Sequence, residues 1–417
     1  MDFHEQTYLD DSDSFVTVYH LTMRGTNFEI GQKLAELAIE RYGISSAKRE
    51  AEPIYSQARR TYLQRNYPIH WERMRGVASA LDLDPNHNGY DFSFLGRRLV
   101  GPLPRIGCSV VYYPPPTMAN GAGYLSRNYD FSAGTMADVV PMPVPPEIKK
   151  QMPRVMSELY IMEWHPEDGG YASLAIHGFE MLSGTLDGIN SAGLVVSIME
   201  DGQAGQELGS NLEMHVGQQK AIGLYELQLM RYLLDTCATV DEAKQALLTS
   251  KQYYAFVPCH YIIADQNGNS FVYENSTWRN KQHMIDGTGQ PQAVTNFQLH
   301  RNLTSDNVPD DTQIAKDGVC SRYQTLTERI SKHDGVFTLS DLKANSASVN
   351  VFNMAMKQKM ETGEEIPPPE LSRTLWHCLY EQQAKTAEFS FYLGEEVHAD
   401  GTHTEHRSDY LKFALGK

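Results

Sequence analysis

The chain has 417 residues, of which 41% are hydrophobic and 21% are charged, and these are ordinary values for a globular protein. Its formal net charge is −16 and the sequence contains no cluster of basic residues, so we expect neither nucleic acid nor a membrane as a partner. The five cysteines lack a CxxC pair, and neither a secretory signal nor an apolar membrane span is recognisable, which favours a cytoplasmic protein without a disulfide framework or structural zinc site.

The first hundred or so residues are predicted to be mostly helical. Residues 15–22 alternate like a strand, and a helix with clear end signals follows. Thr26 is expected to cap this helix, with Glu29 three positions later completing a capping box and Gly43 ending it. The helical pattern then continues over residues 48–85.

Strand patterns begin abruptly after Arg105. Two strands, 108–113 and 124–131, are joined by a loop rich in proline and glycine. Further strands are predicted at 158–164, 171–178, 193–199, 260–265, 269–275 and 292–297, helices at 219–249, 320–331 and 339–346, and a hairpin at 374–394. The order lacks regular alternation of strand and helix, so the sequence predicts an α+β fold with mainly antiparallel sheets. We divide the chain into a mostly helical segment, 1–107, and a strand-rich part, 108–417.

The junction between these parts is Gly107-Cys108. If the chain were cut there, Cys108 would carry both a thiol and a free α-amine, whose ordinary pKa is about 8. The amine could accept the proton of the thiol, as in enzymes with an N-terminal nucleophile, and Gly107 would tolerate the strained backbone that self-cleavage needs. The alternative is that Cys108 is simply a small buried side chain.

Three other residues fit the same chemistry. Asn296, at the end of a predicted strand, could donate a hydrogen bond to an oxyanion. Asp130 could hold the α-amine, and the guanidinium of Arg127 could lie beside the thiolate. Residues three apart point to opposite faces of an ideal strand, so both would reach one site only across a bend or bulge.

Seven motifs occur in one order along most of the chain. They are "RGTNFEIG" near the start, "GCS" at 107–109, "SRNYDF" at 126–131, "DGINSAGLVV" at 187–196, "VTNF" at 294–297, "CSRYQTL" at 320–326 and "SRTLWHCLY…FYLG" at 372–394. In this order they resemble the acyl-coenzyme A:6-aminopenicillanic acid acyltransferase family, which belongs to the N-terminal nucleophile (Ntn) hydrolases and is related to the choloylglycine hydrolases and penicillin V acylase.

The resemblance implies an αββα sandwich, made as a precursor that cleaves itself between Gly107 and Cys108 into two fragments that stay associated. It also implies that Cys108 is the nucleophile, that Arg127 and Asp130 line its site, that Asn296 is an oxyanion donor, and that Arg322 helps to hold the cluster. The expected reaction is hydrolysis of a non-peptide amide, or acyl transfer, through a Cys108 thioester. It needs no metal or redox cofactor, although coenzyme A is a candidate acyl donor.

Two departures from the family pattern concern the choice of substrate. The choloylglycine hydrolases carry a second active-site Asn where this chain has Met199-Glu200-Asp201, so a backbone N–H would replace that donor or Glu200 would bind a cationic substrate group. Phe297 stands where the acyltransferases often have His. We therefore assign Glu200 and Phe297 to substrate binding, and the small-molecule amide or acyl substrate stays unnamed.

Two rival functions remain at this point. One is a binding protein on the same scaffold that is never processed. The other is a metal-dependent amidohydrolase that uses His398, His403 and His406, a stretch which the sequence favours as a solvated polar tail. Association into a homo-oligomer is open.

The remaining candidate residues are expected to be structural. Asn190 and Gly193 should form the tight turn of a hairpin, and Cys237, Cys259 and Cys378 should pack in the core.

Overall fold

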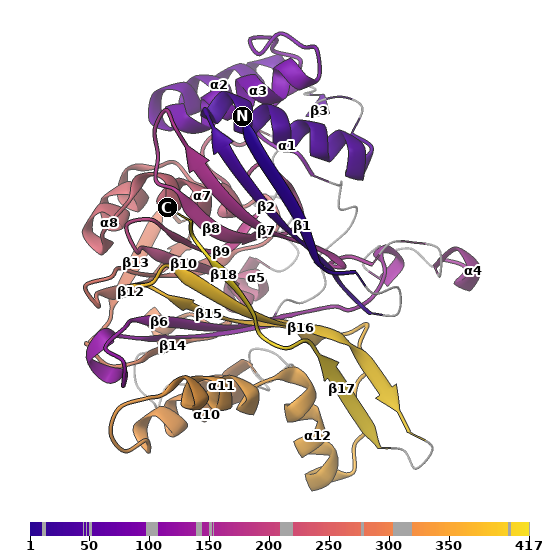
Figure 1. The fold of residues 1–417 in the computed structure, drawn as a ribbon, viewed down its shortest axis with the longest axis vertical. Coiled ribbons are helices and arrows are strands. Elements are labelled where there is room, and N and C mark those ends of the chain that lie inside the picture. Colours follow the sequence, from indigo (N-terminus) through magenta and orange to yellow (C-terminus); the bar gives the residue numbers. More distant parts are fainter. Residues whose placement is uncertain are drawn as a thin grey trace.

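The fold is a four-layer sandwich in which two large sheets face each other and helices cover both outer faces (Figure 1). This computed structural model describes residues 1–10, 14–44, 46, 48–49, 52–96, 107–138, 144–149, 152, 154–208, 220–276, 279–302, 319–398 and 402–416. The α+β class and the αββα sandwich that the sequence predicted are therefore confirmed.

The first sheet has nine strands in the order β1-β2-β7-β8-β9-β10-β11-β12-β13. Their bounds are β1 Asp2–Leu9, β2 Thr17–Gly25, β7 Glu158–Pro166, β8 Ser173–His177, β9 Thr185–Asn190, β10 Val195–Glu200, β11 Cys259–Ala264, β12 Ser270–Ser276 and β13 Lys281–Asp286. Neighbours pair antiparallel except β2 and β7, which run parallel. The inner strands β8, β9 and β11 are buried along their whole length, because helices cover one face and the second sheet covers the other.

The second sheet has seven strands, with β14-β5-β6-β15-β16-β17 in line and β18 beside β16. The bounds are β5 Gly107–Tyr113, β6 Tyr124–Phe131, β14 Gln292–Val294, β15 Arg373–Glu381, β16 Thr386–Val397, β17 His403–Arg407 and β18 Leu411–Ala414. Strands β5 and β6 are completely buried and lie in the middle of the molecule, where β5 contacts β10 of the first sheet. A short ribbon, β3 Lys48–Arg49 with β4 Tyr90–Asp91, lies apart from both sheets.

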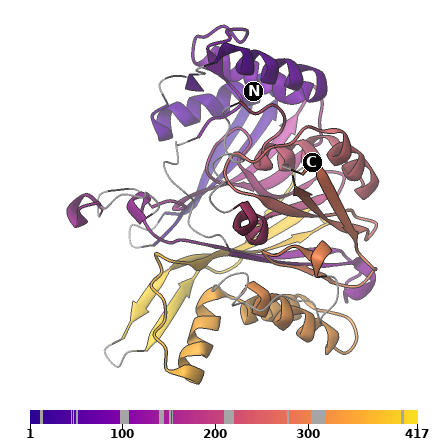
Figure 2. The ribbon, with the colours of Figure 1, turned by 180° about the vertical axis from the view of Figure 1, so that it is seen from behind.

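Helices form the two outer layers, as the opposite views of Figures 1 and 2 show. On the side of the nine-stranded sheet lie α1 Asn27–Tyr42, α2 Pro53–Asn66, α3 Pro68–Ala80, α7 Glu226–Thr236 and α8 Val240–Thr249. Below the second sheet lie α10 Val319–Ser331, α11 Leu339–Ser348 and α12 Val351–Thr362. Short helical segments are α4 Pro146–Lys149, α5 Gly202–Leu208, η1 Pro115–Thr117, η2 Met136–Asp138 and η4 Leu299–Arg301.

The predicted local signals form as expected. Thr26 and Glu29 make a reciprocal capping box at the start of α1, and Gly43 ends the helix with a left-handed φ of 65°. The Asn190 side chain accepts from the backbone N–H groups of residues 192 and 194, and Gly193 has φ of 87°, so the turn between β9 and β10 is confirmed.

Two elements correct the sequence analysis. The acidic N-terminus forms β1, an edge strand of the first sheet. The polar stretch expected to be a solvated tail contains β17, whose residues 403–407 pair with β16. Strand β2 confirms the strand predicted at residues 15–22, and together with β1 it belongs to the large sheet, so position 107 divides the chain without dividing the core.

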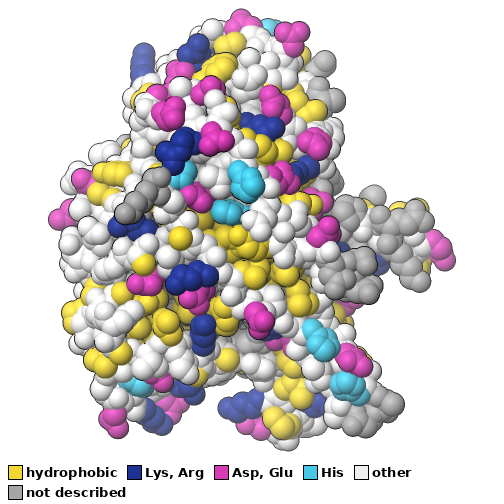
Figure 3. Space-filling view, in the orientation of Figure 1, with side chains coloured by type: hydrophobic (Ala, Val, Ile, Leu, Met, Phe, Trp, Pro, Cys, Tyr) yellow, Lys and Arg dark blue, Asp and Glu magenta, His cyan; other side chains and the backbone are white. Residues whose placement is uncertain are grey.

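The side of the molecule that Figure 3 presents is not a single charged face. Figure 3 shows acidic and basic side chains interspersed over the side that it presents. Among the residues that the structure describes, no helix is both long and apolar enough to cross a membrane.

Candidate active site

Cys108 lies at the beginning of β5, between the two sheets, and is 0% exposed. On the adjacent strand β6, Tyr129 lies directly opposite Cys108, and Asn128 lies opposite the next residue, Ser109. Because strand side chains alternate, Cys108 shares its inner face with Tyr129 and Arg127. The continuous apolar run of β5 thus carries the thiol into the centre of the sandwich.

Arg127 contacts the thiol directly. Its Nη2 donates to Cys108 Sγ at 3.2 Å and to the carbonyl oxygen of Ile198 at 2.6 Å. Its Nη1 donates to the carbonyl oxygen of Leu186 at 3.1 Å and forms an ion pair with Asp187. The guanidinium is therefore fixed by the first sheet while it faces a side chain of the second.

The environment of the thiol has two opposing effects on its acidity. Burial raises the pKa of Cys108, and the Arg127 guanidinium beside it acts in the other direction. Burial has the larger effect, so in the uncut chain the thiol is less acidic than an exposed one. A nearby base is needed to activate it.

Asp130 lies on the opposite face of β6 from Arg127, as strict alternation requires. Its carboxylate forms an ion pair with Arg322 of α10 and accepts a hydrogen bond from Thr374 Oγ1 at 2.6 Å. The side chains of Asp130 and Arg322 lie close to Gly107, where an added Cβ would lie 2.7 Å from Arg322 Nη1 and 3.1 Å from Asp130 Cβ. No bend of β6 is needed, because Arg127 serves the thiol and Asp130 lies beside the peptide bond before it.

Asn296 connects the two faces of this cluster. It follows β14, the edge neighbour of β5, and its Oδ1 accepts from the backbone N–H of Cys108 at 2.7 Å and from Arg322 Nη2 at 3.2 Å. Its Nδ2 donates to the carbonyl oxygen of Glu200 at 2.9 Å. In the uncut chain the amide of Asn296 therefore holds the nitrogen atom that would become the α-amine.

Buried charges hold the turn that carries Asn296. Glu274 accepts from the backbone N–H groups of Leu299 at 2.6 Å and His300 at 3.1 Å. His260 lies 3.6 Å from Glu274 and hydrogen bonds to the carbonyl oxygen of Thr295 at 2.6 Å. Glu274 and His260 thus fix this turn from the first sheet.

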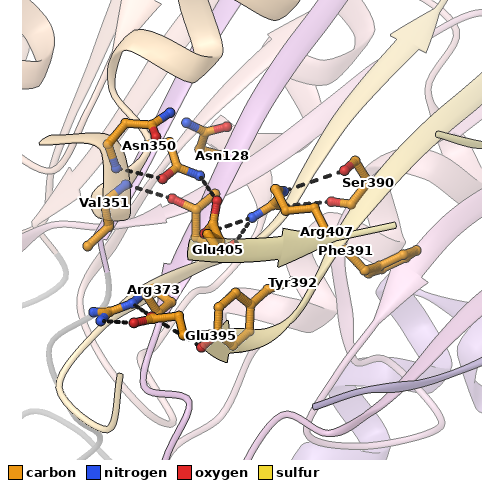
Figure 4. Close-up of polar contacts among 12 residues, drawn as sticks. Asn128, Asn350, Val351, Arg373, Ser390, Phe391, Tyr392, Glu395, Glu405 and Arg407 are labelled. Carbon is orange, nitrogen blue, oxygen red and sulfur yellow. Dashed lines mark hydrogen bonds and ion pairs between the residues drawn. The ribbon is translucent and has the colours of Figure 1, made fainter. Parts of the chain in front are cut away.

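A polar network supports Asp130 from behind. Thr374, which donates to Asp130, accepts from the backbone N–H of Val351 at 3.0 Å, and its carbonyl oxygen accepts from Arg407 at 2.7 Å. Figure 4 shows Arg407 of β17 extended towards Ser390, near Glu405 and Asn350. The C-terminal strands therefore help to position the site.

A pocket of about 390 Å³, including space open to solvent, begins at the thiol. Its walls are mainly apolar and aromatic, and its polar lining includes Arg127, Glu200 and Glu226. Cys259, expected to be a core residue, also lines it. Phe297 is completely buried, packs edge-on against Tyr323 and is not among the residues of the pocket wall.

The structure thus brings together Gly107, Cys108, Arg127, Asp130, Asn296 and Arg322, and it places Glu200 in the adjoining pocket. Their catalytic and substrate-binding roles stay predictions, as does that of Phe297. Sequence reasoning missed Asp187, Thr374 and Glu226. The first two lie within quoted motifs, but only the fold reveals that each one holds a charged side chain of the cluster.

The C-terminal histidines do not gather into a described metal site. His398 and His406 lie 3.4 and 3.7 Å from Glu396. Within the described ranges no group of three or more His, Cys, Asp or Glu residues could hold a metal ion.

The αββα sandwich, with a buried thiol beside a fixed guanidinium at the start of a central strand, is typical of N-terminal nucleophile enzymes, which hydrolyse amides or transfer acyl groups. The chain belongs to the acyl-coenzyme A:6-aminopenicillanic acid acyl-transferase family, whose sequence profile matches residues 117–392. The matched segment contains Arg127, Asp130, Asn296 and Arg322 and begins after Cys108.

Solved structures add two remote similarities. Penicillin V acylase from Agrobacterium tumefaciens is 18% identical, with 68% of this chain and 82% of that chain covered and a TM-score of 0.40. A mutant of the conjugated bile acid hydrolase from Clostridium perfringens is 12% identical, with 72% and 97% covered and a TM-score of 0.34. No curated protein matches the sequence.

Proposed function

We propose that the protein is a self-processing amidohydrolase or acyltransferase with Cys108 as its N-terminal nucleophile. The observation that carries this proposal is the arrangement around one peptide bond. The thiol of Cys108 contacts Arg127, its backbone nitrogen contacts Asn296, and the residue before it has no side chain to separate that bond from Arg322 and Asp130.

Processing requires one exchange of bonds at this position. Cys108 Sγ attacks the carbonyl carbon of Gly107, the C–N bond breaks, and the proton of the thiol passes to the released α-amine. Water then hydrolyses the Gly107 thioester, which leaves a carboxylate on Gly107 and a free thiol on Cys108. We assign stabilisation of the oxyanion of the first step to the Arg322 guanidinium; this is supported by its closeness to Gly107, where an added Cβ would lie 2.7 Å from Arg322 Nη1.

The same thiol then serves the catalytic reaction. The α-amine, with an ordinary pKa near 8, takes the proton of the thiol, and the thiolate attacks the substrate amide. The leaving amine receives that proton, and the acyl group stays on Cys108 as a thioester. Water or an acceptor amine releases it, and an acyl thioester such as acyl-coenzyme A is an alternative donor by the same route.

Asn296 is the proposed donor to the oxyanion of the substrate. Its amide already lies within hydrogen-bond distance of the Cys108 nitrogen, and its Nδ2 would exchange the Glu200 carbonyl oxygen for the oxyanion. Loss of one such donor typically costs about 3 kcal/mol of transition-state stabilisation.

The test is to trap the acyl-enzyme. The purified protein is mixed with 4-nitrophenyl butyrate, quenched in acid and measured by intact mass. We expect one butyryl group on the 108–417 fragment of the wild type and none on Cys108→Ala. Cys259→Ala removes the other cysteine of the same pocket and should keep the adduct. A butyryl group on Cys108→Ala, or release of nitrophenol by Cys108→Ala as fast as by the wild type, would refute the mechanism.

A further inference from the structure

The pocket beside Cys108 has an acidic lining. Its basic residue, Arg127, is already paired with Asp187 and bound to Cys108 Sγ. Glu200 and Glu226 also line the pocket, and no other lysine, arginine or histidine is among its described lining residues. A ligand in this pocket therefore meets carboxyl groups without meeting an unengaged cation.

Glu226 is the more deeply buried of the two, with 2% of its surface exposed. It stands at the start of α7, and its carboxylate accepts from the backbone N–H groups of Ala255 at 2.7 Å, Phe256 at 2.7 Å and Val257 at 3.2 Å. No cationic group among the described residues forms an ion pair with it. Burial raises its pKa to about 7 although these backbone hydrogen bonds act in the other direction, and a cation placed beside it would favour the ionised carboxylate.

The wall of the same pocket includes a tyrosine whose buried hydroxyl is unpaired among the described atoms. Tyr129 is 2% exposed, lines the pocket beside Cys108, and its hydroxyl has no hydrogen-bond partner among the described atoms. Its ring is stacked on Trp376, with 3.9 Å between the centroids, so the side chain is rigidly held. A buried hydroxyl without a partner is destabilising, and a hydrogen bond to a polar group of a ligand would remove that cost. This observation points to a polar ligand independently of the carboxylates.

The walls around these polar groups are aromatic. Phe179 and Phe256 both line the pocket, with 6.2 Å between their ring centroids, and the backbone of Phe256 is bonded to Glu226. Aromatic faces attract cations, and this attraction is strongest where water is excluded. Carboxylate and aromatic groups together are the lining that suits an ammonium ion.

We propose that this pocket selects an acyl group that ends in a protonated amine, with Glu226 as the acceptor of its charge and Tyr129 as a second polar contact. The proposal rests on the proposed function in placing the acyl group at Cys108. It implies that an acyl group of the same length with a terminal carboxylate is rejected, because Arg127 is engaged and the remaining lining charges are acidic.

The first experiment reads the charge preference from the thiol, without requiring amide hydrolysis. Cys108 is labelled with 2-aminoethyl, propyl and 2-sulfonatoethyl methanethiosulfonate, which differ mainly in terminal charge. The rate of labelling at Cys108 is measured by peptide mass spectrometry and divided by the rate at which the same reagent labels free cysteine. We expect the normalised labelling rate of the cationic reagent to exceed that of the neutral reagent by about tenfold, and that of the anionic reagent by more. Equal rates, or a preference for the anion, in the wild type would overturn the proposal whatever any variant does.

Two variants locate the preference. Glu226→Gln should bring the cationic and neutral rates to within about threefold of each other. Glu180→Gln is the matched control, since Glu180 is also buried, is 1% exposed, and does not line the pocket, so the preference should persist. A preference that survives in a folded Glu226→Gln protein would contradict the role of Glu226.

The second experiment compares substrates. We would measure kcat/KM for 4-nitroanilides of ω-amino acids with two to five methylene groups, and for the alkanoyl and carboxyacyl compounds of matched length. The best aminoacyl compound should exceed its alkanoyl match by tenfold or more, and Glu226→Gln should abolish this difference. An alkanoyl match that is hydrolysed as fast would overturn the proposal. Selective labelling without hydrolysis of any anilide would support the ammonium pocket and count against the proposed amidase reaction.

Discussion

The glycine before Cys108, the proposed nucleophile, is explained by close approach rather than by unusual backbone angles. Gly107 lies within a regular strand and is not among the residues with positive φ. A side chain there would meet Arg322 at 2.7 Å and Asp130 at 3.1 Å. The sequence analysis singled out Gly107 for a different physical reason, its tolerance of a strained backbone. Close approach could not be predicted, because Asp130 and Arg322 lie more than twenty and more than two hundred positions further along the chain.

Gly107→Ala should therefore impair processing. The added methyl group displaces the Arg322–Asp130 pair from the bond that is cut, and we expect cleavage to slow by about tenfold or more, which is ~1.4 kcal/mol in the barrier. The measurement is the appearance of the two fragments with time after cell-free synthesis, followed by denaturing mass spectrometry. Gly205→Ala is the control, since a Cβ at Gly205 meets nothing within 4 Å. Cleavage of Gly107→Ala at the rate of the control would contradict this explanation.

Arg127 and Asp130 show how far spacing alone could go. Alternation correctly separates their faces, but a shared site then seemed to need a bulge in their strand. The bulge is instead in β15, where Leu375 has no partner between Thr374 and Trp376, and it lies opposite β6. The sequence analysis singled out both residues as candidates for one site. That Arg127 faces the thiol while Asp130 faces the peptide bond before it depends on which elements cover the two faces of β6.

Among the elements, those with a one-sided or continuous apolar pattern could be predicted from the sequence. Strand β5 is a mostly apolar run, β6 follows it after a loop rich in proline and glycine, and both strands form where expected. The edge strands β1 and β13 were missed because exposed positions interrupt their pattern, and α12 was missed because Phe352 is its sole fully buried described residue. Their formation depends on pairing or packing with distant parts of the chain.

Glu180 joins three elements and gives the fold a dependence on pH. Its carboxylate accepts from the backbone N–H groups of Leu95 and Leu182 and from the hydroxyl of Tyr225, at the start of α7. Burial raises its pKa from an ordinary 4.5 to about 7. A carboxyl group of this kind favours folding most below its unfolded pKa, and that contribution is lost as the pH rises from about 4.5 through about 7.

Replacing Glu180 with Gln should therefore cost less as the pH rises. At pH 5 the variant loses a well-paired neutral carboxyl and is less stable than the wild type. By pH 8 the difference in free energy of unfolding should shrink or reverse by up to about 3 kcal/mol, because the wild type alone must bury a carboxylate. Urea unfolding of both proteins at pH 5, 6, 7 and 8 measures this. A difference that does not change with pH would show that Glu180 titrates as it does in the unfolded chain.

At the scale of the whole molecule, the two sides of position 107 are built into one core. Strands β1 and β2 precede it and β7 follows it, yet β2 pairs with β7 along nine residues of the same sheet. Helix α1 packs on β2 from outside. Separation of the fragments after cleavage would expose this whole face, so we expect them to stay together in native solution and to part only in denaturant.

The central claim is that Cys108 becomes a chain terminus, and one measurement tests it most directly. Purified wild type and Cys108→Ala are each passed through a sizing column under native conditions and then measured by denaturing intact mass. The account predicts that the wild type elutes as one species containing two fragments cut between Gly107 and Cys108, and that Cys108→Ala remains a single chain. A wild-type protein that stays uncut would contradict the account and favour an unprocessed binding protein. Cleavage of Cys108→Ala at the same bond would show that another protease makes the cut.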